Sequence, residues 1–285
     1  MTQQTSSPLH SADAQWWKQA VVYQVYPRSF KDTSGSGLGD IAGVTEQVPY
    51  LKKLGVDAIW LSPFYPSQLA DGGYDVDDYR NVDPNLGTMD DFDELARAAH
   101  EAGLKLVVDI VPNHSSNRHE WFKAAVAAGP GSPARDRYIF RDGRGEHGEL
   151  PPTNWIASFG GSAWTRVPDG QWYLHMFTAE QPDWNWKNAD VHEDFKKTLR
   201  FWLDHGADGF RIDVAHGLAK DLDRDDLDDF KIIGDETRIT DGTHPLYDRN
   251  EVHDIYREWR TVFNEYDPPA FAVAEAWCPP NRQYL

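Results

Sequence analysis

Short runs of β-branched and aromatic residues alternate along the chain with longer segments that have helical periodicity. The short runs predict five strands, at Val21–Pro27, Ala58–Ser62, Leu104–Val111, Gly209–Val214 and Ala270–Trp277. Most of these runs are apolar throughout, which is typical of strands that are covered on both faces. A chain that alternates such strands with helices predicts a parallel sheet.

The segments between the strands predict helices with recognisable ends. We expect helices at Ile41–Gly55, from Thr88 to Gly103, from Asp190 to Gly206 and from Asn250 to Tyr266. Thr88 with Asp91, and Asp190 with Glu193, have the spacing of a capping box at a helix N-terminus. Pro49 is expected to kink the first helix or to set a second start within it.

Residues 115–188 interrupt this alternation with a stretch rich in Gly, Pro, Trp and Arg. A structureless loop of that length is uncommon inside a domain, so the stretch predicts an inserted subdomain. The expected organisation is a disordered N-terminal segment at 1–15, strands one to three within 16–114, the insertion at 115–188, and strands four and five within 189–285.

Two parallel-sheet architectures fit this order of elements, a doubly wound sheet and a (β/α) barrel. The doubly wound, nucleotide-binding architecture needs a glycine-rich first turn that leads straight into a helix. Gly35, Gly37 and Gly39 follow the first strand, but their spacing is not GxGxxG. The barrel is therefore favoured, and a barrel needs about 250 of the 285 residues.

Charge and composition narrow the class of ligand. With 46 acidic and 28 basic residues the net charge is -18, which argues against nucleic acid and anionic membranes as partners. Aromatic residues make up 13% of the chain and can form the core or sugar-binding platforms. Cys278 is the single cysteine, so no internal disulfide is expected, and Met1–Gln19 lacks an apolar signal core. We therefore expect a cytoplasmic protein that acts on a neutral substrate.

Charged residues stand at the ends of three consecutive predicted strands. Strand three ends in Asp109, strand four carries Arg211 and Asp213, and strand five carries Glu275. The two-residue period of a strand places Arg211 and Asp213 on one face. A structural ion pair is the alternative for those two residues, but carboxylates at three successive strand ends favour an active site, because barrel active sites lie at that end.

Five segments together resemble the α-amylase family, glycoside hydrolase family 13, in its α-glucosidase and oligo-1,6-glucosidase branch. They are DGGYDVDDY (Asp71–Tyr79), DIVPNH (Asp109–His114), QPDWNW (Gln181–Trp186), GFRIDV (Gly209–Val214) and VAEAW (Val273–Trp277). The resemblance covers the chain from Trp16 onward. It implies a TIM (β/α)8-type barrel, of which only the first five strands are present, with an inserted subdomain after strand three.

The resemblance also implies a retaining glycosidase with Asp213 as nucleophile and Glu275 as acid/base. Retaining enzymes need two carboxyl groups about 5–5.5 Å apart. Arg211 beside Asp213 is expected to keep that carboxylate ionised and oriented. The neighbours Phe271, Val273 and Ala274 are expected to give Glu275 apolar surroundings that keep it protonated, as an acid requires.

Further positions match the family's contacts to the terminal glucose. They are Asp71, Tyr74, His114, Phe177, Gln181 and Arg211. Tyr74 and Phe177 can pack against a ring face, and Asp71 at the closed end would favour release of a single glucose. The alternatives are a core histidine for His114 and a linker residue for Gln181, while Asp109 and Asn113 are expected to be structural supports.

Two features depart from the family pattern. In many relatives the loop that corresponds to Asp32–Asp40 holds a calcium ion, but here Ser34 and Ser36 replace two ligands. We expect no required cofactor and no metal among the site residues, with calcium at Asp32 and Asp40 as the alternative. The family's third carboxylate, an Asp after a His, does not follow Glu275 before Leu285. We therefore expect a fragment that is inactive alone, or a chain that a second polypeptide completes.

Several functions remain open at this stage. The main expectation is an α-glucosidase that releases glucose from the non-reducing end of α-linked gluco-oligosaccharides. The alternatives are a transglycosylase or sucrose/maltose isomerase of the same family, and an inactive family-13-like subunit. Val214 resembles α-1,6-acting relatives, whereas Ala215 and His216 depart from them, so the linkage stays open.

Overall fold

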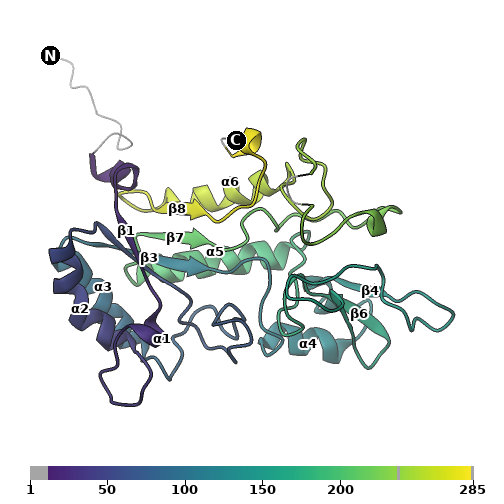
Figure 1. Cartoon of the computed structure of the whole chain (residues 1–285), viewed down its shortest axis with the longest axis horizontal. Coiled ribbons are helices and arrows are strands. Elements are labelled where there is room, and N and C mark those ends of the chain that lie inside the picture. The colour runs from purple at the N-terminus through teal and green to yellow at the C-terminus, as the bar shows by residue number, and fades with distance from the viewer. Residues whose placement is uncertain (1–11, 236–237, 284–285) are drawn as a thin grey trace.

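A five-stranded parallel sheet forms the centre of the molecule (Figure 1). The computed structural model describes residues 12–235 and 238–283. The strand order is β1-β2-β3-β7-β8, which follows the order of the chain. The strands are β1 (Val22–Val25), β2 (Ala58–Leu61), β3 (Lys105–Ile110), β7 (Gly209–Ile212) and β8 (Phe271–Ala274). All five predicted strands are confirmed, although each is shorter than its sequence pattern.

Helices and short 3-10 turns connect these strands. The helices are α1 (Pro27–Phe30), α2 (Ile41–Leu54), α3 (Met89–Glu101), α4 (Glu120–Ala128), α5 (Ala189–Asp204) and α6 (Val252–Phe263). The 3-10 turns are η2 (Ala12–Lys18), η3 (Arg135–Arg137), η4 (Leu227–Asp229) and η5 (Pro280–Arg282). None of the helices in the described part of the chain is long and apolar enough to cross a membrane.

A second, antiparallel sheet lies beyond α4, at the far end of the molecule's long axis (Figure 1). It consists of β4 (Phe140–Asp142), β5 (Trp164–Arg166) and β6 (Gln171–Leu174), in the order β4-β6-β5. Its hydrophobic cluster joins Trp155 and Trp164 to Ile232 and Leu246 from the loop after β7. The predicted insertion therefore contains regular structure, and its core is shared with residues outside 115–188. The domain boundaries themselves remain a prediction.

The main core lies between the parallel sheet and its helices. Large aromatic side chains pack there, for example Phe64 against Trp202 with ring centroids 5.1 Å apart. One charged pair is buried beside this core, where the Arg28 guanidinium lies 2.6 Å from the Asp83 carboxylate. Burying a charge needs such a partner, because an isolated ion loses its hydration.

The predicted capping boxes at the N-termini of α3 and α5 can be compared with the structure, and only the one at α3 is present. At α3 the capping box is confirmed, since Thr88 Oγ1 accepts from the Asp91 amide and the Asp91 carboxylate accepts from the Thr88 amide. At α5 the predicted Asp190–Glu193 capping box is wrong. Asn188 caps this helix instead, because its side-chain oxygen accepts from the Asp190 amide. Asn is as good a cap as Asp, and here it stands two residues earlier.

Replacing Thr88 with alanine should lower the free energy of unfolding by about 1 kcal/mol, because the Asp91 amide loses its side-chain acceptor. Urea denaturation measures this change. Thr45→Ala is the matched control, since Thr45 lies inside α2 and its hydroxyl donates to the Ile41 carbonyl without capping a helix end. Equal destabilisation in both variants would contradict a capping effect.

A 3-10 turn begins within the N-terminal segment that is expected to be disordered. Residues 1–11 lie outside the described residues, but residues 12–15 belong to η2. Trp16 and Trp17 follow in the same turn, and each ring centroid lies 5.4 Å from that of Phe271 on β8. The aromatic contacts hold this turn against β8, and the expected disorder of residues 1–15 stays a prediction.

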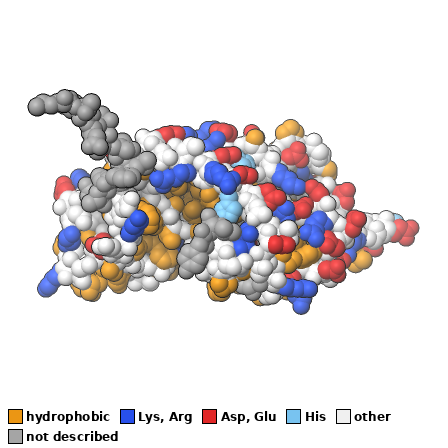
Figure 2. Space-filling view, turned by 90° about the horizontal axis from the view of Figure 1, so that it is seen from above, with side chains coloured by type: hydrophobic (Ala, Val, Ile, Leu, Met, Phe, Trp, Pro, Cys, Tyr) orange, Lys and Arg blue, Asp and Glu red, His pale blue; other side chains and the backbone are white. Residues whose placement is uncertain are grey.

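The parallel sheet is open, because β1 and β8 each pair with one neighbour. Val22 on β1 is 44% exposed and Val273 on β8 is 46% exposed. Figure 2 views the molecule from the side on which β8 lies uppermost in Figure 1, and hydrophobic side chains gather there. Unpaired strand edges with apolar side chains favour association with further polypeptide.

Candidate active site

The strand register brings the predicted site residues together. In the sheet Asp109 on β3 pairs with Arg211 on β7, and Arg211 pairs with Val273 on β8. Asp213 and Glu275 follow directly after β7 and β8, so both carboxylates leave the sheet at the same edge. The arrangement follows from parallel pairing, which aligns the carboxyl ends of neighbouring strands.

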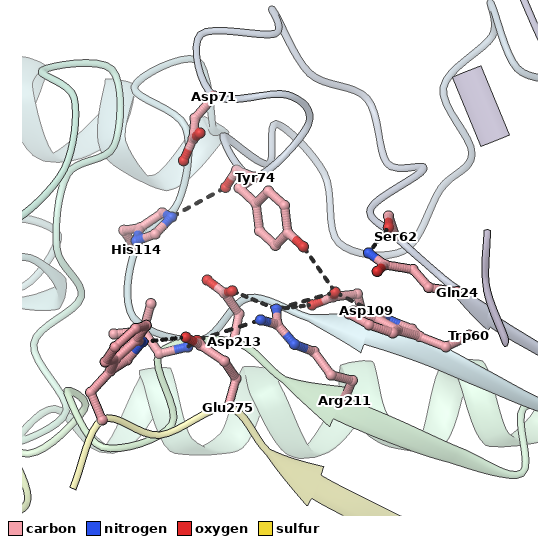
Figure 3. A network of polar contacts seen from close by, with 12 residues as sticks. Gln24, Trp60, Ser62, Asp71, Tyr74, Asp109, His114, Arg211, Asp213 and Glu275 are labelled. Atoms are coloured by element: carbon pink, nitrogen blue, oxygen red, sulfur yellow. Dashed lines mark hydrogen bonds and ion pairs between the residues drawn. The ribbon is translucent and has the colours of Figure 1, made fainter. Parts of the chain in front are cut away.

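Arg211 lies at the centre of this cluster (Figure 3). Its Nη1 donates to Asp213 Oδ1 at 2.5 Å and to both carboxylate oxygens of Asp109, at 3.1 and 3.2 Å. Its Nη2 lies 3.4 Å from Glu275 Oε2. One guanidinium therefore contacts three carboxylates. The contact between Arg211 and Asp213 confirms that the two residues face the same side of β7.

Burial dominates the electrostatics of Asp213. Desolvation raises the pKa of this carboxyl to about 7, Arg211 opposes that shift, and the Glu275 carboxylate adds to it. Burial also raises the pKa of Asp109, and the nearby charge of Asp213 adds to that shift. Arg211 contacts Asp213 as expected, but burial and the Glu275 charge oppose its effect on the pKa, so the ionised state of Asp213 stays a prediction.

Glu275 lies in surroundings that differ from those expected. Its Oε2 accepts from the Val214 amide at 2.9 Å, and its Oε1 accepts from Trp277 Nε1 at 2.8 Å. Its side chain is 33% exposed. The expected apolar surroundings are wrong, because the Glu275 carboxyl contacts Arg211, the Val214 amide and the Trp277 indole N–H. The observed contacts orient the Glu275 carboxyl rather than isolate it from polar groups.

A cavity of about 490 Å³ opens beside these carboxylates. Seven of the eight predicted site residues line it: Asp71, Tyr74, His114, Phe177, Arg211, Asp213 and Glu275. The eighth, Gln181, is buried behind the cavity wall, where its Nε2 donates to Asp71 Oδ2 at 3.0 Å and lies 3.0 Å from His114 Nε2. The structure thus brings all eight residues together, and their roles toward a substrate stay predictions.

Aromatic rings and hydrogen bonds fix the walls of this cavity. The rings of His114 and Phe177 lie 5.2 Å apart. The Tyr74 hydroxyl donates to Asp109 Oδ2 at 3.2 Å, so Tyr74 is held by the same carboxylate as Arg211. Asp109, expected as a structural support, accepts from Trp60 Nε1 as well. This buried carboxylate holds three side chains at the floor of the cavity.

The sequence patterns did not single out several residues that the structure places at the site. Ile232, Ile233, Tyr247 and Trp277 complete the cavity wall, and Trp60 contacts Asp109. His216 also lines the cavity. Burial lowers the pKa of its imidazole to about 4. The sequence could have indicated Trp277, because it stands two residues after Glu275 and the two-residue period of a strand places both side chains on one face. The sequence could not have indicated Ile232, Ile233 and Tyr247, because they come from a loop without periodicity.

The pH dependence of turnover should reflect the burial of Asp213. If Asp213 is the nucleophile that the family resemblance implies, it attacks in the ionised form, and burial raises the pKa of this carboxyl to about 7. The ionised fraction grows as the pH rises through that value, so kcat/KM should fall as the pH drops below about 7. A pH–rate profile measures this limb. A kcat/KM that stays constant down to about pH 5 would contradict the assignment of a raised pKa to the attacking group.

The carboxylates of the loop Asp32–Asp40 accept hydrogen bonds from backbone amides. Asp32 accepts from the amides of Ser34, Gly35 and Gly37, and Asp40 accepts from the amides of Thr33 and Gly43. These contacts fix the shape of the loop, and calcium at Asp32 and Asp40 stays the alternative to a site without metal. Across the described residues, no cluster of three or more His, Cys, Asp or Glu side chains could hold a metal ion.

A larger cavity of about 670 Å³ lies elsewhere, between residues of the small sheet and the start of α6. Its basic side chains already have partners: Arg141 and Lys187 both contact Asp223, and Arg249 contacts Glu251. It contains none of the eight predicted site residues. The cavity beside Asp213 is therefore the better candidate for an active site.

Known proteins resemble this chain in both sequence and structure. It is 50% identical over 207 residues to a trehalose-6-phosphate hydrolase of Escherichia coli, which covers 72% of this chain and 37% of that protein. It is 43% identical over 263 residues to an α-glucosidase of Apis mellifera, which covers 90% of this chain and 46% of that protein. The chain thus spans less than half the length of these relatives.

The fold comparison agrees with the sequence comparison. The crystal structure of Bacillus licheniformis trehalose-6-phosphate hydrolase superposes with a TM-score of 0.81 at 42% identity, over 92% of this chain and 45% of that one. The trehalulose synthase of Pseudomonas mesoacidophila gives the same TM-score over 93% of this chain and 46% of that one. The model of the α-amylase catalytic domain matches residues 24–284. The five strands are therefore part of a TIM-type barrel, and the chain belongs to the α-amylase family.

Proposed function

We propose that the protein is a retaining α-glucosidase that releases glucose from the non-reducing end of α-linked gluco-oligosaccharides. The observation that carries this proposal is the contact of one guanidinium, Arg211, with both Asp213 and Glu275 in the cavity wall. A shared cation favours the short carboxyl separation of retaining enzymes over the wider separation of inverting ones. The α-glucosidases and trehalose-6-phosphate hydrolases among the relatives support the same reaction class.

The two carboxyl groups have different roles in this proposal. Asp213 attacks the anomeric carbon while Glu275 gives its proton to the glycosidic oxygen, so the glycosidic bond breaks and a glucosyl ester forms on Asp213. Glu275 then takes a proton from water, which attacks the anomeric carbon and frees Asp213. The hydrogen bonds from Val214 and Trp277 orient the Glu275 carboxyl for both steps. We propose that the reaction needs no cofactor, because two carboxyl groups supply all the chemistry.

The charges of the cavity wall favour a neutral glucoside. Among the described residues that line it, Arg211 is the sole Lys or Arg, and it already contacts three carboxylates. Recognition of a phosphate needs cationic or N–H groups that are available to it. We therefore infer a preference for unphosphorylated substrates in this part of the site, in contrast to the substrate in the name of the trehalose-6-phosphate hydrolases.

Transglycosylation and isomerisation stay as alternatives that use the same carboxyl pair. The likeness to a trehalulose synthase favours the isomerase alternative specifically. The outcome depends on whether water or a second sugar reaches the glucosyl ester beside Val214 and His216. A second polypeptide along the open edge of β8 also remains a prediction.

A product analysis on the protein as encoded, with any sequence beyond residue 285, tests the proposal. The substrates are maltose, isomaltose, sucrose, trehalose-6-phosphate and p-nitrophenyl α-glucoside. Proton NMR during turnover should show α-glucose as the first product. β-Glucose as the first product would exclude the retaining mechanism, and an isomeric disaccharide from sucrose would favour the isomerase. Preferred cleavage of trehalose-6-phosphate would contradict the neutral-substrate inference.

A further inference from the structure

A lysine without an assigned role is buried against Asn113, and it lines the larger cavity rather than the one beside Asp213. Lys220 lies in the loop after β7, and its side chain is 3% exposed. Its Nζ donates to Asn113 Oδ1 at 2.7 Å and to the Gly217 carbonyl at 2.7 Å, and it lies 3.2 Å from Asp183 Oδ2. An ammonium has three N–H donors. Two of them donate to Asn113 and Gly217, and Asp183 Oδ2 is an ion-pair partner without a hydrogen bond from the ammonium.

The ammonium determines which way the Asn113 amide faces. Because Lys220 Nζ can only donate, the atom of Asn113 that faces it is the oxygen, Oδ1. The amide nitrogen Nδ2 then faces Asp183 Oδ1 at 3.4 Å and His114 Nδ1 at 3.2 Å. The Asp183 carboxylate can only accept, so it requires the same orientation. Two charged neighbours therefore fix one amide.

The fixed amide in turn determines where His114 carries its proton. An N–H of Asn113 faces His114 Nδ1, so that nitrogen has to accept and cannot carry a proton. The proton is then on Nε2, which lies 3.2 Å from the Tyr74 carbonyl. The other tautomer would place two N–H groups against each other at Nδ1 and would leave the Tyr74 carbonyl without this donor.

The neighbouring Gln181 opposes that assignment at one contact. Gln181 Oε1 accepts from the Thr178 amide and hydroxyl, at 3.0 and 3.1 Å, so the amide nitrogen Nε2 faces Asp71 and lies 3.0 Å from His114 Nε2. With its proton on Nε2, His114 still meets both Asn113 and Tyr74, whereas with its proton on Nδ1 it would meet Gln181 alone. One N–H of Gln181 donates to Asp71 Oδ2 at 3.0 Å. Burial lowers the pKa of His114 to about 3, the Tyr74 carbonyl opposes this shift, and the charge of Lys220 adds to it.

We propose that Lys220 is a positioning residue that, through Asn113, keeps His114 neutral with its proton on Nε2. The protonation state of His114 matters because of Asp71. Gln181 Nε2 contacts both Asp71 Oδ2 and His114 Nε2, so the two side chains are close neighbours. A charged imidazole there would draw the Asp71 carboxylate away from substrate hydroxyl groups. A fixed neutral tautomer leaves Asp71 free to accept from them. The effect on turnover rests on the proposed glucosidase function, whereas the tautomer does not.

The experiment observes the imidazole nitrogens directly. We would record ¹⁵N spectra of histidine-labelled protein, expressed as encoded, and identify His114 by the signals that His114→Gln removes. The unmodified protein should show Nε2–H and a bare Nδ1, with no titration between about pH 5 and 8. Lys220→Met should give a mixture of tautomers and a higher pKa for His114, and should lower kcat/KM about 10-fold.

A double variant separates positioning from simple charge neutralisation. Lys220→Met alone leaves the Asp183 carboxylate buried without its cation and could unfold the protein. Lys220→Met with Asp183→Asn removes both charges, so the fold should be retained while the altered tautomer persists. Lys187→Met is the matched control, because Lys187 pairs with Asp223 on the surface and contacts no site residue. It should leave tautomer and turnover unchanged.

Each result decides a different part of the inference. If the double variant keeps the original tautomer and the original kcat/KM, Lys220 only neutralises Asp183, and the proposal is overturned. If the tautomer changes while turnover of every glucoside stays the same, positioning by Lys220 is supported and the role of His114 at the sugar is wrong. If the unmodified protein cleaves no glucoside, the proposed function fails, and the spectra still decide the role of Lys220.

Discussion

Replacing Asp213 with asparagine should abolish turnover of p-nitrophenyl α-glucoside, with a loss of at least about 10⁴-fold in kcat. An amide cannot form the glucosyl ester, and no other carboxylate takes the place of Asp213 directly after β7. The fold should be retained, since the amide oxygen can still accept from Arg211 Nη1. Circular dichroism and steady-state kinetics on the protein as encoded measure the two effects separately.

The same variant should be at least as stable as the unmodified protein at neutral pH. Burial raises the folded pKa of Asp213 to about 7, above its value of about 3.9 in an unfolded chain. The unfolded state therefore releases this proton first, and the group lowers stability as the pH rises from about 4 through 7. Asparagine removes that loss. Asp226→Asn, at an exposed position, is the control, and near-normal turnover by Asp213→Asn would show that the nucleophile is another residue.

Replacing Glu275 with glutamine should produce a loss that depends on the leaving group. Maltose needs a proton on its departing oxygen, so its kcat/KM should fall by about 10²–10⁴-fold. p-Nitrophenol leaves with little help, so its glucoside should be affected much less in the first step. The substituted amide keeps one side-chain oxygen that can still accept from Val214 or Trp277, which limits the change to proton transfer.

A matched control for this variant is Glu258→Gln, because Glu258 pairs with His192 far from the carboxylate cluster. It should leave the turnover of both substrates unchanged. An equal loss on maltose and on the nitrophenyl glucoside in Glu275→Gln would indicate an electrostatic or structural effect. That result would contradict the assignment of Glu275 as the general acid.

The backbone of this site was predictable because it depends on local periodicity. Apolar runs located all five strands, and the alternation within Gly209–Val214 placed Arg211 and Asp213 on one face. Parallel pairing then brings Asp109, Asp213 and Glu275 to one edge without any further information. The resemblance to the α-amylase family supplied the more distant Asp71, Phe177 and Gln181, which no periodicity connects.

The environment of each group was harder to predict, because it depends on contacts between distant segments. Glu275 has apolar neighbours in sequence, yet its carboxyl contacts Arg211, Val214 and Trp277. Lys220 stands directly before Asp221 at the start of a charged stretch, and only the fold reveals that Asn113 and Asp183 surround it. At α5, both Asn188 and Asp190 are good caps, and propensity alone does not choose between them.

The order of the strands has a consequence for how the protein is made. Along the order β1-β2-β3-β7-β8, each strand pairs with the parallel strand that was synthesised before it. During translation each new strand can therefore add to the edge of a sheet that has already formed. Asp109 is the first member of the carboxylate cluster to emerge, and Arg211 meets it when β7 is added. The cation is thus in place before Glu275 is synthesised. We expect nascent chains long enough for Val214 to have left the ribosome to have already paired Arg211 with Asp109, so the charged centre forms during translation rather than after release.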